Sequence, residues 1–141
     1  RSNQNITIKY PFSYTGLTAK DLASYDCILW FAGHSSVTES NQDPIGAINN
    51  NMVNLIDFLK KIPNDNTLFI YASTASLYSG IEGPVKENVK VVPYENAYDI
   101  SKFSFDYLAQ RFHQNIIGLR MGTLAGYSPN IRKELIFNFK D

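Results

Sequence analysis

Two short, almost wholly apolar runs place the strongest constraint on the fold of this chain. Residues 26–32 have the sequence DCILWFA and end at Gly33, and residues 67–72 have the sequence TLFIYA and end at Ser73. Strands that are apolar at consecutive positions are typical of a parallel sheet with helices on both faces. We therefore expect both runs to be central strands buried on both faces, with Cys27 as a small buried apolar residue.

Helical patterns separate these runs. Asp43 and Pro44 are typical of a helix cap and first turn, and apolar residues then recur every three or four positions to about Lys61. Further elements are expected at Ile6–Tyr10 (strand), Lys20–Leu22 (helical turn), 79–94 (irregular loop), Glu95 to about Gln114 (helix), Ile116–Arg120 (strand) and Ile131–Phe139 (helix). This alternation predicts the α/β class, with a doubly wound parallel sheet and right-handed crossovers.

The helix predicted over residues 95–114 carries two apolar stripes on nearly opposite faces. One consists of Ala97, Ile100, Phe103 and Tyr107, and the other of Phe105, Leu108 and Phe112. A helix that is apolar on two sides is usually buried on two sides. We expect one face to cover the sheet and the other to meet a partner.

Composition excludes several classes of protein. The 141 residues include 13 Lys plus Arg and 13 Asp plus Glu, so the formal net charge is zero and the basic excess of a nucleic-acid binder is missing. No apolar run approaches the ~18 residues that cross a bilayer. One cysteine and no visible signal peptide lead us to expect the cytoplasm, with no nucleic-acid or membrane partner.

The residues that follow the predicted strands carry the candidate chemistry, because parallel sheets bind ligands beyond the carboxyl ends of their strands. Tyr98 and Lys102 are spaced i, i+4 on one helix, so the ammonium can favour the phenolate that exchanges a proton with a substrate. A surface tyrosine beside a solvated lysine is the alternative. Thr74 follows a predicted strand and can hydrogen-bond the same substrate oxygen, or cap a turn with Ser73 and Ser76. Gly33 permits close approach of a ligand to the backbone, or simply ends a strand.

Several motifs together resemble the NAD-dependent sugar-nucleotide epimerase/dehydratase family, which belongs to the extended short-chain dehydrogenase/reductases. They are FAGHSSV (31–37), DP (43–44) with NN (50–51), STASLY (73–78), Glu87, Tyr98-x-x-x-Lys102 and LRMGTLAG (119–126). The resemblance extends from about Ala23 to Asn138 and implies a Rossmann-like sheet that binds NAD or NADP.

The resemblance also implies roles for individual residues. Tyr98 would be the catalytic acid and base, Lys102 would favour its ionisation and hold the nicotinamide ribose, and Thr74 would hold the reacting oxygen of the substrate. Thr123 would also face the substrate. The remaining cofactor-binding residues would be Phe31, Ala32, Gly33, Ser35, Asn50, Ala72, Ser73, Met121, Gly122 and Leu124. Helices 44–61 and 95–114 would form a four-helix homodimer interface, and no metal is implied.

The chain departs from the family pattern in four respects. It has no glycine-rich G-x-x-G-x-x-G turn after a first strand and lacks most of the C-terminal substrate region, so the Rossmann-like fold is incomplete. We therefore expect residues 1–141 to be the central and C-terminal part of an NAD(P)-binding domain, from the middle of a longer protein. Ala75-Ser76 follow Thr74 where the family's 4,6-dehydratases have Asp-Glu, which argues against dehydration. Asn54 replaces a family glycine, and His34 has no family role.

The leading interpretation is an NAD(P)-dependent epimerase that oxidises a hydroxyl of a sugar nucleotide transiently, with hydride passing to the nicotinamide and back. An NAD(P)-dependent reductase of a keto-sugar or small carbonyl compound would use the same residues. A non-catalytic relative that only binds the dinucleotide is the interpretation from a different functional class.

Overall fold

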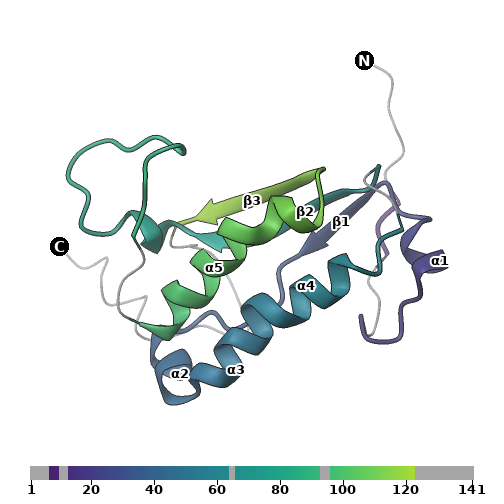
Figure 1. Cartoon of the computed structure of the whole chain (residues 1–141), viewed down its shortest axis with the longest axis horizontal. Helices are drawn as coiled ribbons and strands as arrows, with labels where there is room; N and C mark the ends of the chain where they lie inside the picture. The colour runs from purple at the N-terminus through teal and green to yellow at the C-terminus, as the bar shows by residue number, and fades with distance from the viewer. Residues whose placement is uncertain (1–6, 10–12, 64–65, 93–95, 123–141) are drawn as a thin grey trace.

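A parallel three-stranded sheet forms the centre of the molecule (Figure 1). The computed structural model describes residues 7–9, 13–63, 66–92 and 96–122. The strands are β1 (Cys27–Trp30), β2 (Leu68–Thr74) and β3 (Ile116–Met121), in the order β1-β2-β3. Leu29 pairs with Ile70, and Ala72 pairs with Leu119. The three predicted core strands and their parallel arrangement are confirmed.

The helices connect the strands as the alternation predicted. They are α1 (Ala19–Leu22), α2 (Val37–Gln42), α3 (Pro44–Ile48), the π-helical turn η1 (Asn49–Val53), α4 (Asn54–Leu59), the 3-10 turn η2 (Ala75–Tyr78) and α5 (Ala97–Phe112). Asp43 accepts a hydrogen bond from the Gly46 amide at 2.9 Å, and Pro44 is the first helical residue, so the predicted cap is confirmed. The helix predicted over 44–61 is continuous through α3, η1 and α4.

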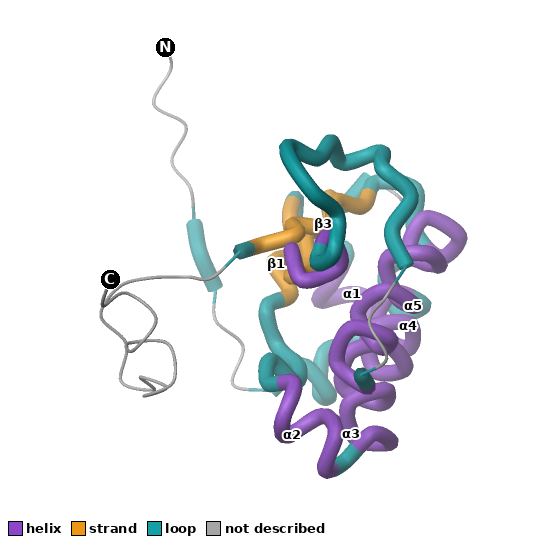
Figure 2. Tube along the Cα trace, turned by 90° about the vertical axis from the view of Figure 1, so that its left-hand side faces the viewer, coloured by secondary structure: helices purple, strands orange, loops and turns teal. Residues whose placement is uncertain are grey.

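Aromatic side chains fill the space between the sheet and the helices. The Trp30 and Phe58 rings lie 4.7 Å apart between centroids, and Tyr71 meets Phe105 edge to face at the same separation. Each such pair adds about 1 kcal/mol beyond the area that it buries. Figure 2 shows helices α4 and α5 on one side of the strands. This one-sided core positions α5 against β2 and β3.

Two predictions about the strands are wrong. Leu29 exposes 61% of its surface and Cys27 is exposed, so β1 is not buried on both faces and Cys27 is not a buried residue. Ile117 of β3 is also 47% exposed. The reason is that successive side chains of a strand point to opposite faces, and the described helices cover only one of them. Residues 7–9 are not in a strand. The helix expected at 131–139 lies outside the described residues, whereas the loop expected after residue 79 is confirmed over 79–92.

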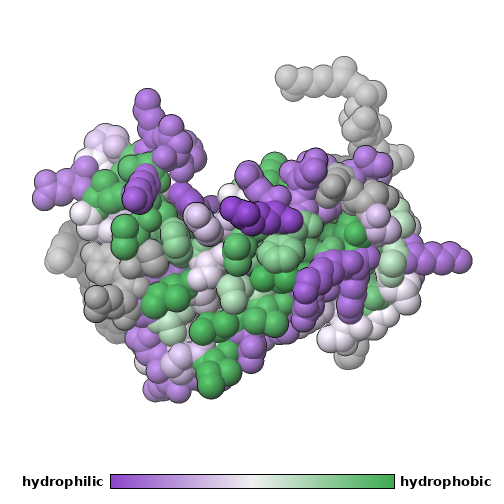
Figure 3. All heavy atoms as spheres, viewed as in Figure 1, coloured by the Kyte–Doolittle hydropathy of each residue, from purple (hydrophilic) through white to green (hydrophobic). Residues whose placement is uncertain are grey.

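The outer surface of the helices is also apolar. Phe105 and Ala109 of α5 are buried against the sheet, while Ile100 and Tyr107 are exposed, so the two predicted stripes of this helix do face opposite ways. Figure 3 shows apolar side chains gathered over α3, α4 and α5. We call this surface the outer helix face; its exposed members are Ile45, Ile48, Val53, Ile100 and Tyr107. None of the described helices is long and apolar enough to cross a bilayer.

Candidate active site

The carboxyl end of β2 meets the first half of α5, and this junction brings the predicted catalytic lysine to the sheet. Lys102 is buried, and its Nζ donates a hydrogen bond to the Ala72 carbonyl at 3.1 Å. Burial lowers the pKa of Lys102 below its ordinary value, and the nearby Asp106 carboxylate offsets part of that shift. Lys102 is therefore held against the backbone of Ala72 near the carboxyl end of β2.

Tyr98 lies one helical turn before Lys102 and is half-buried. Ser101 Oγ donates to the Tyr98 carbonyl at 2.7 Å and accepts from Asn51 Nδ2 at 3.0 Å, so a buried amide of η1 anchors this turn of α5. No hydrogen bond to the Tyr98 hydroxyl occurs among the described residues.

Thr74 is the last residue of β2 and the cap of η2. Its Oγ1 accepts a hydrogen bond from the Ser76 amide at 3.2 Å and lies 2.8 Å from Ser76 Oγ. Ser76 Oγ in turn donates to the buried carboxylate of Asp99. The structure thus confirms that Thr74 caps the turn. Its hydroxyl nevertheless remains at the carboxyl end of β2, the part of a parallel sheet where ligands bind.

The loop after β1 packs closely against η1. Gly33 has φ +134°, and a Cβ at this position would lie 2.4 Å from Asn51 Oδ1, so the position requires glycine. His34 Nε2 and Asn50 Nδ2 lie 3.3 Å apart, and Asn54 Nδ2 donates to Asn50 Oδ1 at 3.2 Å. His34 and Asn54, which had no assigned role, thus contact the predicted cofactor residue Asn50.

Polar atoms with no partner surround this loop. Asn51 Oδ1 and His34 Nδ1 are buried without a hydrogen-bond partner among the described residues. Phe31, Ala32 and Ser35 are exposed beside them. Unsatisfied buried groups of this kind call for a ligand or water. A dinucleotide along this loop therefore fits the residues present.

The end of β3 completes the described part of the site. Met121 pairs with Thr74 in the sheet register, and Gly122 follows it directly. Thr123 and Leu124, which the sequence assigned to substrate and cofactor, lie outside the described residues. No group of three or more potential metal-ligating side chains occurs within the described ranges.

A polar cluster at the edge of the sheet was missed by the sequence analysis. Asp106 accepts hydrogen bonds from Tyr71 Oη at 2.8 Å, Ser73 Oγ at 2.9 Å and Arg120 Nε at 3.1 Å. Arg120 also donates to the Tyr78 hydroxyl at 2.8 Å and lies over the ring of that tyrosine. Burial and the Asp106 charge raise the pKa of Tyr71 far above its ordinary value.

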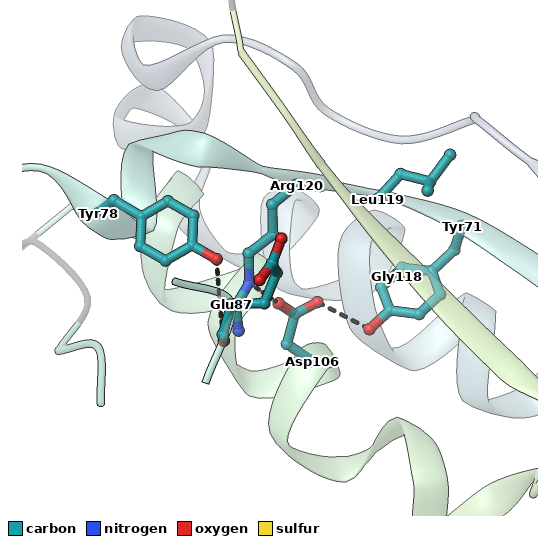
Figure 4. A pocket seen from close by; sticks show the side chains of 7 residues that line it. All are labelled: Tyr71, Tyr78, Glu87, Asp106, Gly118, Leu119 and Arg120. Atoms are coloured by element: carbon teal, nitrogen blue, oxygen red, sulfur yellow. Dashed lines mark hydrogen bonds and ion pairs between the residues drawn. The ribbon is translucent and has the colours of Figure 1, made fainter. Parts of the chain in front are cut away.

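This cluster lines a cavity of about 470 Å³ beside β3 (Figure 4). The cavity is bounded by Tyr71, Tyr78, Glu87, Asp106, Gly118, Leu119 and Arg120, and it includes none of the predicted catalytic residues. Asp106 follows Lys102 by four positions, so the i, i+4 spacing that paired Tyr98 with Lys102 would have placed it on the same helix face. Its partners on β2 and β3 are long-range contacts that no local spacing reveals.

Comparisons with known proteins agree with this geometry. The family model "NAD dependent epimerase/dehydratase family" matches residues 15–139. The chain is 30% identical over 115 residues to UDP-glucose 4-epimerase of Halalkalibacterium halodurans, and 31% identical over 112 residues to that of Mycoplasma pneumoniae. These matches cover 77% and 73% of this chain but 34% and 33% of the relatives, so the chain spans about a third of their length.

A solved structure shows the same fold with cofactor. UDP-glucuronic acid 4-epimerase from Bacillus cereus, in complex with NAD, matches with a TM-score of 0.61 and 26% identity over 79% of this chain and 37% of that protein. RMD from Pseudomonas aeruginosa, complexed with NADPH, matches with a TM-score of 0.61 at 20% identity over 84% of this chain and 45% of that protein, and supports the fold alone. The sheet described above is therefore part of a Rossmann-like fold, and the chain belongs to the NAD dependent epimerase/dehydratase family.

Proposed function

We propose that this chain is the central and C-terminal part of an NAD(P)-binding domain and carries the catalytic residues of a sugar-nucleotide epimerase. The observation that carries the proposal is the buried Lys102 ammonium, held against the Ala72 carbonyl near the end of β2 and one helical turn from the half-buried Tyr98. Relatives named as UDP-glucose and UDP-glucuronic acid 4-epimerases support a UDP-hexose as substrate.

The residues of this chain would perform the proton chemistry. Tyr98 accepts the proton of a sugar hydroxyl, and the positive charge of Lys102 stabilises the phenolate that does so. Thr74 holds the oxygen of that hydroxyl. The nicotinamide, when bound, supplies the site that takes and returns the hydride. Tyr98 then returns its proton to the oxygen of the epimerised sugar.

The cofactor would lie along the loop after β1. The backbone at Gly33, the side chain of Asn50 and the Lys102 ammonium would hold it, with Phe31, Ala32 and Ser35 along the same loop. Ala72, Ser73, Met121 and Gly122 would line the nicotinamide end. The unpartnered polar atoms of His34 and Asn51 support this placement.

The outer helix face would form a homodimer. Ile45, Ile100 and Tyr107 expose large apolar surfaces on neighbouring helices, and apolar area of this kind is typical of a protein interface. A second copy of the chain would bury it through α3–α4 and α5. The free thiol of Cys27 supports a reducing, cytoplasmic location.

Turnover of a UDP-sugar by the intact protein tests the proposal. With UDP-glucose and NAD, we expect formation of the 4-epimer, and Tyr98→Phe should lower kcat by at least about 100-fold while NAD binding persists. Tyr107→Phe, on the exposed face of the same helix, is the matched control and should retain activity. Full turnover by Tyr98→Phe would overturn the acid-base role.

Net reduction of a keto-sugar, without epimerisation, would favour the reductase alternative. Binding of NAD with no turnover of either substrate class would favour a non-catalytic relative. Native mass spectrometry of the same preparation reports the retained nucleotide and the number of subunits. A monomer would contradict the proposed homodimer.

A further inference from the structure

The buried ammonium of Lys102 has no carboxylate in direct contact with it. Its Nζ donates to the neutral carbonyl of Ala72 at 3.1 Å, and it forms no ion pair with any residue that the structure describes. Lys102 is only 9% exposed, so little water reaches the charge. Burial accordingly lowers the pKa of Lys102, because the charged form loses much of its hydration. A nearby negative charge is therefore what would keep this lysine protonated.

The Asp106 carboxylate lies in the right place to supply that charge. Asp106 follows Lys102 by four positions on α5, so the two side chains share a face of the helix. They reach consecutive residues of β2, since Lys102 binds the Ala72 carbonyl and Asp106 accepts from Ser73 Oγ at 2.9 Å. The side chain of Asp106 is also largely buried, with 9% exposed, and solvent screens such charges only weakly. The Asp106 charge accordingly raises the pKa of Lys102 against the effect of burial.

The elements packed against α5 contribute few other titratable side chains among the described residues. They are Tyr71 on β2, Tyr78 on η2, Arg120 on β3, and the exposed Glu39 on α2 and Asp57 on α4, whereas α3 and η1 contain none. On α5 itself, Tyr98 and Asp99 precede Lys102, and the Asp99 carboxylate is bound by Ser76 and Asn96. Among all these groups, Asp106 is the one whose charge favours the Lys102 ammonium.

Arg120 opposes the effect of Asp106 without cancelling it. Its Nε donates to the Asp106 carboxylate at 3.1 Å in an ion pair (Figure 4). A positive charge beside the carboxylate weakens the negative field that reaches Lys102. However, the Arg120 side chain is 24% exposed, against 9% for Asp106, so water screens the cation more than the anion. The ion pair therefore leaves a net negative field at Lys102.

We propose that Asp106 is a positioning residue that acts through Lys102: its charge keeps the buried lysine an ammonium, and Arg120 sets how strongly it does so. This inference rests on the proposed function, in which the Lys102 ammonium stabilises the Tyr98 phenolate. An enzyme with this arrangement loses activity on the alkaline side, when Lys102 loses its proton. The polar cluster beside β3 would thus set the upper limit of the pH range in which the enzyme works.

The protonation of Lys102 can be followed directly and without a ligand. NMR shifts of the lysine ε-carbons, recorded over a series of pH values on the intact protein, give the midpoint of each titration, and Lys102→Met assigns the signal. We expect the Lys102 midpoint to move to lower pH in Asp106→Asn and to stay unchanged in Asp106→Glu, which keeps the charge. Glu87→Gln is the matched control, because Glu87 lines the same cavity but is exposed to solvent. An unchanged or raised midpoint in Asp106→Asn would overturn the proposal.

Substitutions of Arg120 separate an electrostatic role of the cluster from a merely structural one. Arg120→Gln removes the charge that opposes Asp106, so the Lys102 midpoint should move to higher pH. Arg120→Lys keeps the charge but loses the paired hydrogen bonds, and it should leave the midpoint unchanged. If the cluster only held α5 in place, both variants would loosen it, admit water to Lys102 and raise the midpoint alike. That result, or no shift in Arg120→Gln, would overturn the proposal even if Asp106→Asn does not fold.

Turnover tests the consequence for the reaction. At the pH of the wild-type midpoint, the ammonium fraction and kcat should be about 3-fold lower in Asp106→Asn than in the wild type, with KM unchanged. If the wild-type protein turns over no UDP-sugar, the proposed function is wrong, and the NMR midpoints still decide whether Asp106 acts on Lys102. If the midpoint moves and the alkaline limb of kcat does not, Asp106 does not act on the reaction through Lys102, and the proposed function is unaffected.

Discussion

The carboxylate of Asp106 accepts a hydrogen bond from Ser73 Oγ at 2.9 Å, which joins the middle of α5 to the strand end that carries the candidate site. The same carboxylate accepts from Tyr71 and forms an ion pair with Arg120. One acidic side chain thus fixes α5 against both β2 and β3. A change at Asp106 is therefore expected to alter both the stability of the fold and the position of α5 relative to the end of β2.

Replacement of Asp106 by asparagine should destabilise the protein strongly. The side chain of Asp106 is 9% exposed and that of Arg120 is 24% exposed, so asparagine weakens a partly buried ion pair and the hydrogen bonds that the carboxylate accepts, at an expected cost of about 2 kcal/mol. Urea unfolding measures the difference. Asp57→Asn is the control, because its ion pair with Lys60 is exposed and should contribute less than about 1 kcal/mol. Equal losses of unfolding free energy in the two variants would show that Asp106 contributes no more to stability than an exposed ion pair does.

Tyr71 should make the stability of the protein depend on alkaline pH. Its pKa is raised in the folded state, so the folded chain keeps the phenol protonated when the unfolded chain begins to lose the proton near pH 10. The stabilisation is complete below that pH, and the unfolding free energy falls by about 1.4 kcal/mol per pH unit above it. Denaturant unfolding of wild type and Tyr71→Phe between pH 8 and about 11 measures the difference in slope. Identical slopes would show that Tyr71 does not titrate abnormally.

The charged form of Lys102, which we propose assists the reaction, should lower the stability of the folded protein. Burial lowers its pKa from the ordinary 10.5, so the folded state disfavours the charged form. The penalty is present in full below the folded-state pKa and vanishes as the pH rises toward the unfolded value. We expect Lys102→Met to raise the unfolding free energy by about 1 kcal/mol at neutral pH, with loss of turnover. Thermal unfolding of the wild type and of Lys102→Met at a series of pH values measures the difference. A gain in the stability of Lys102→Met that grows toward high pH would contradict the prediction.

Gly33→Ala should lower the unfolding free energy more than Gly83→Ala, although both glycines have a positive φ. Gly33 combines φ +134° with a Cβ position 2.4 Å from Asn51 Oδ1, whereas Gly83 has φ +78° and open space around it. Backbone strain alone costs about 1 kcal/mol at Gly83, and the collision with a buried side chain should bring the loss at Gly33 to about 3 kcal/mol. Urea unfolding of both variants provides the comparison, and NAD affinity should fall only for Gly33→Ala.

Local patterns in the sequence determined much of the fold. The apolar runs at 26–32 and 67–72 predicted β1 and β2, and Asp43-Pro44 predicted the start of α3, because strand periodicity and helix caps depend on neighbouring residues. The i, i+4 pair Tyr98 and Lys102 was placed correctly on α5 for the same reason. The roles of the predicted site residues remain proposals.

The tertiary structure decided what local patterns do not contain. Burial of a strand face depends on which elements pack against it, so Leu29, Ile117 and Cys27 are exposed despite their apolar context. The hydrogen bonds of Asp106 to Arg120 and Tyr71 join residues that are 14 and 35 positions apart. The hydrogen bond from Ser76 to Asp99 joins residues that are 23 positions apart. Such contacts form only when the sheet and α5 come together. The sequence by itself therefore determined the helices and strands and the candidate catalytic residues. The packing of α5 on β2 and β3 decided which side chains contact and orient those residues.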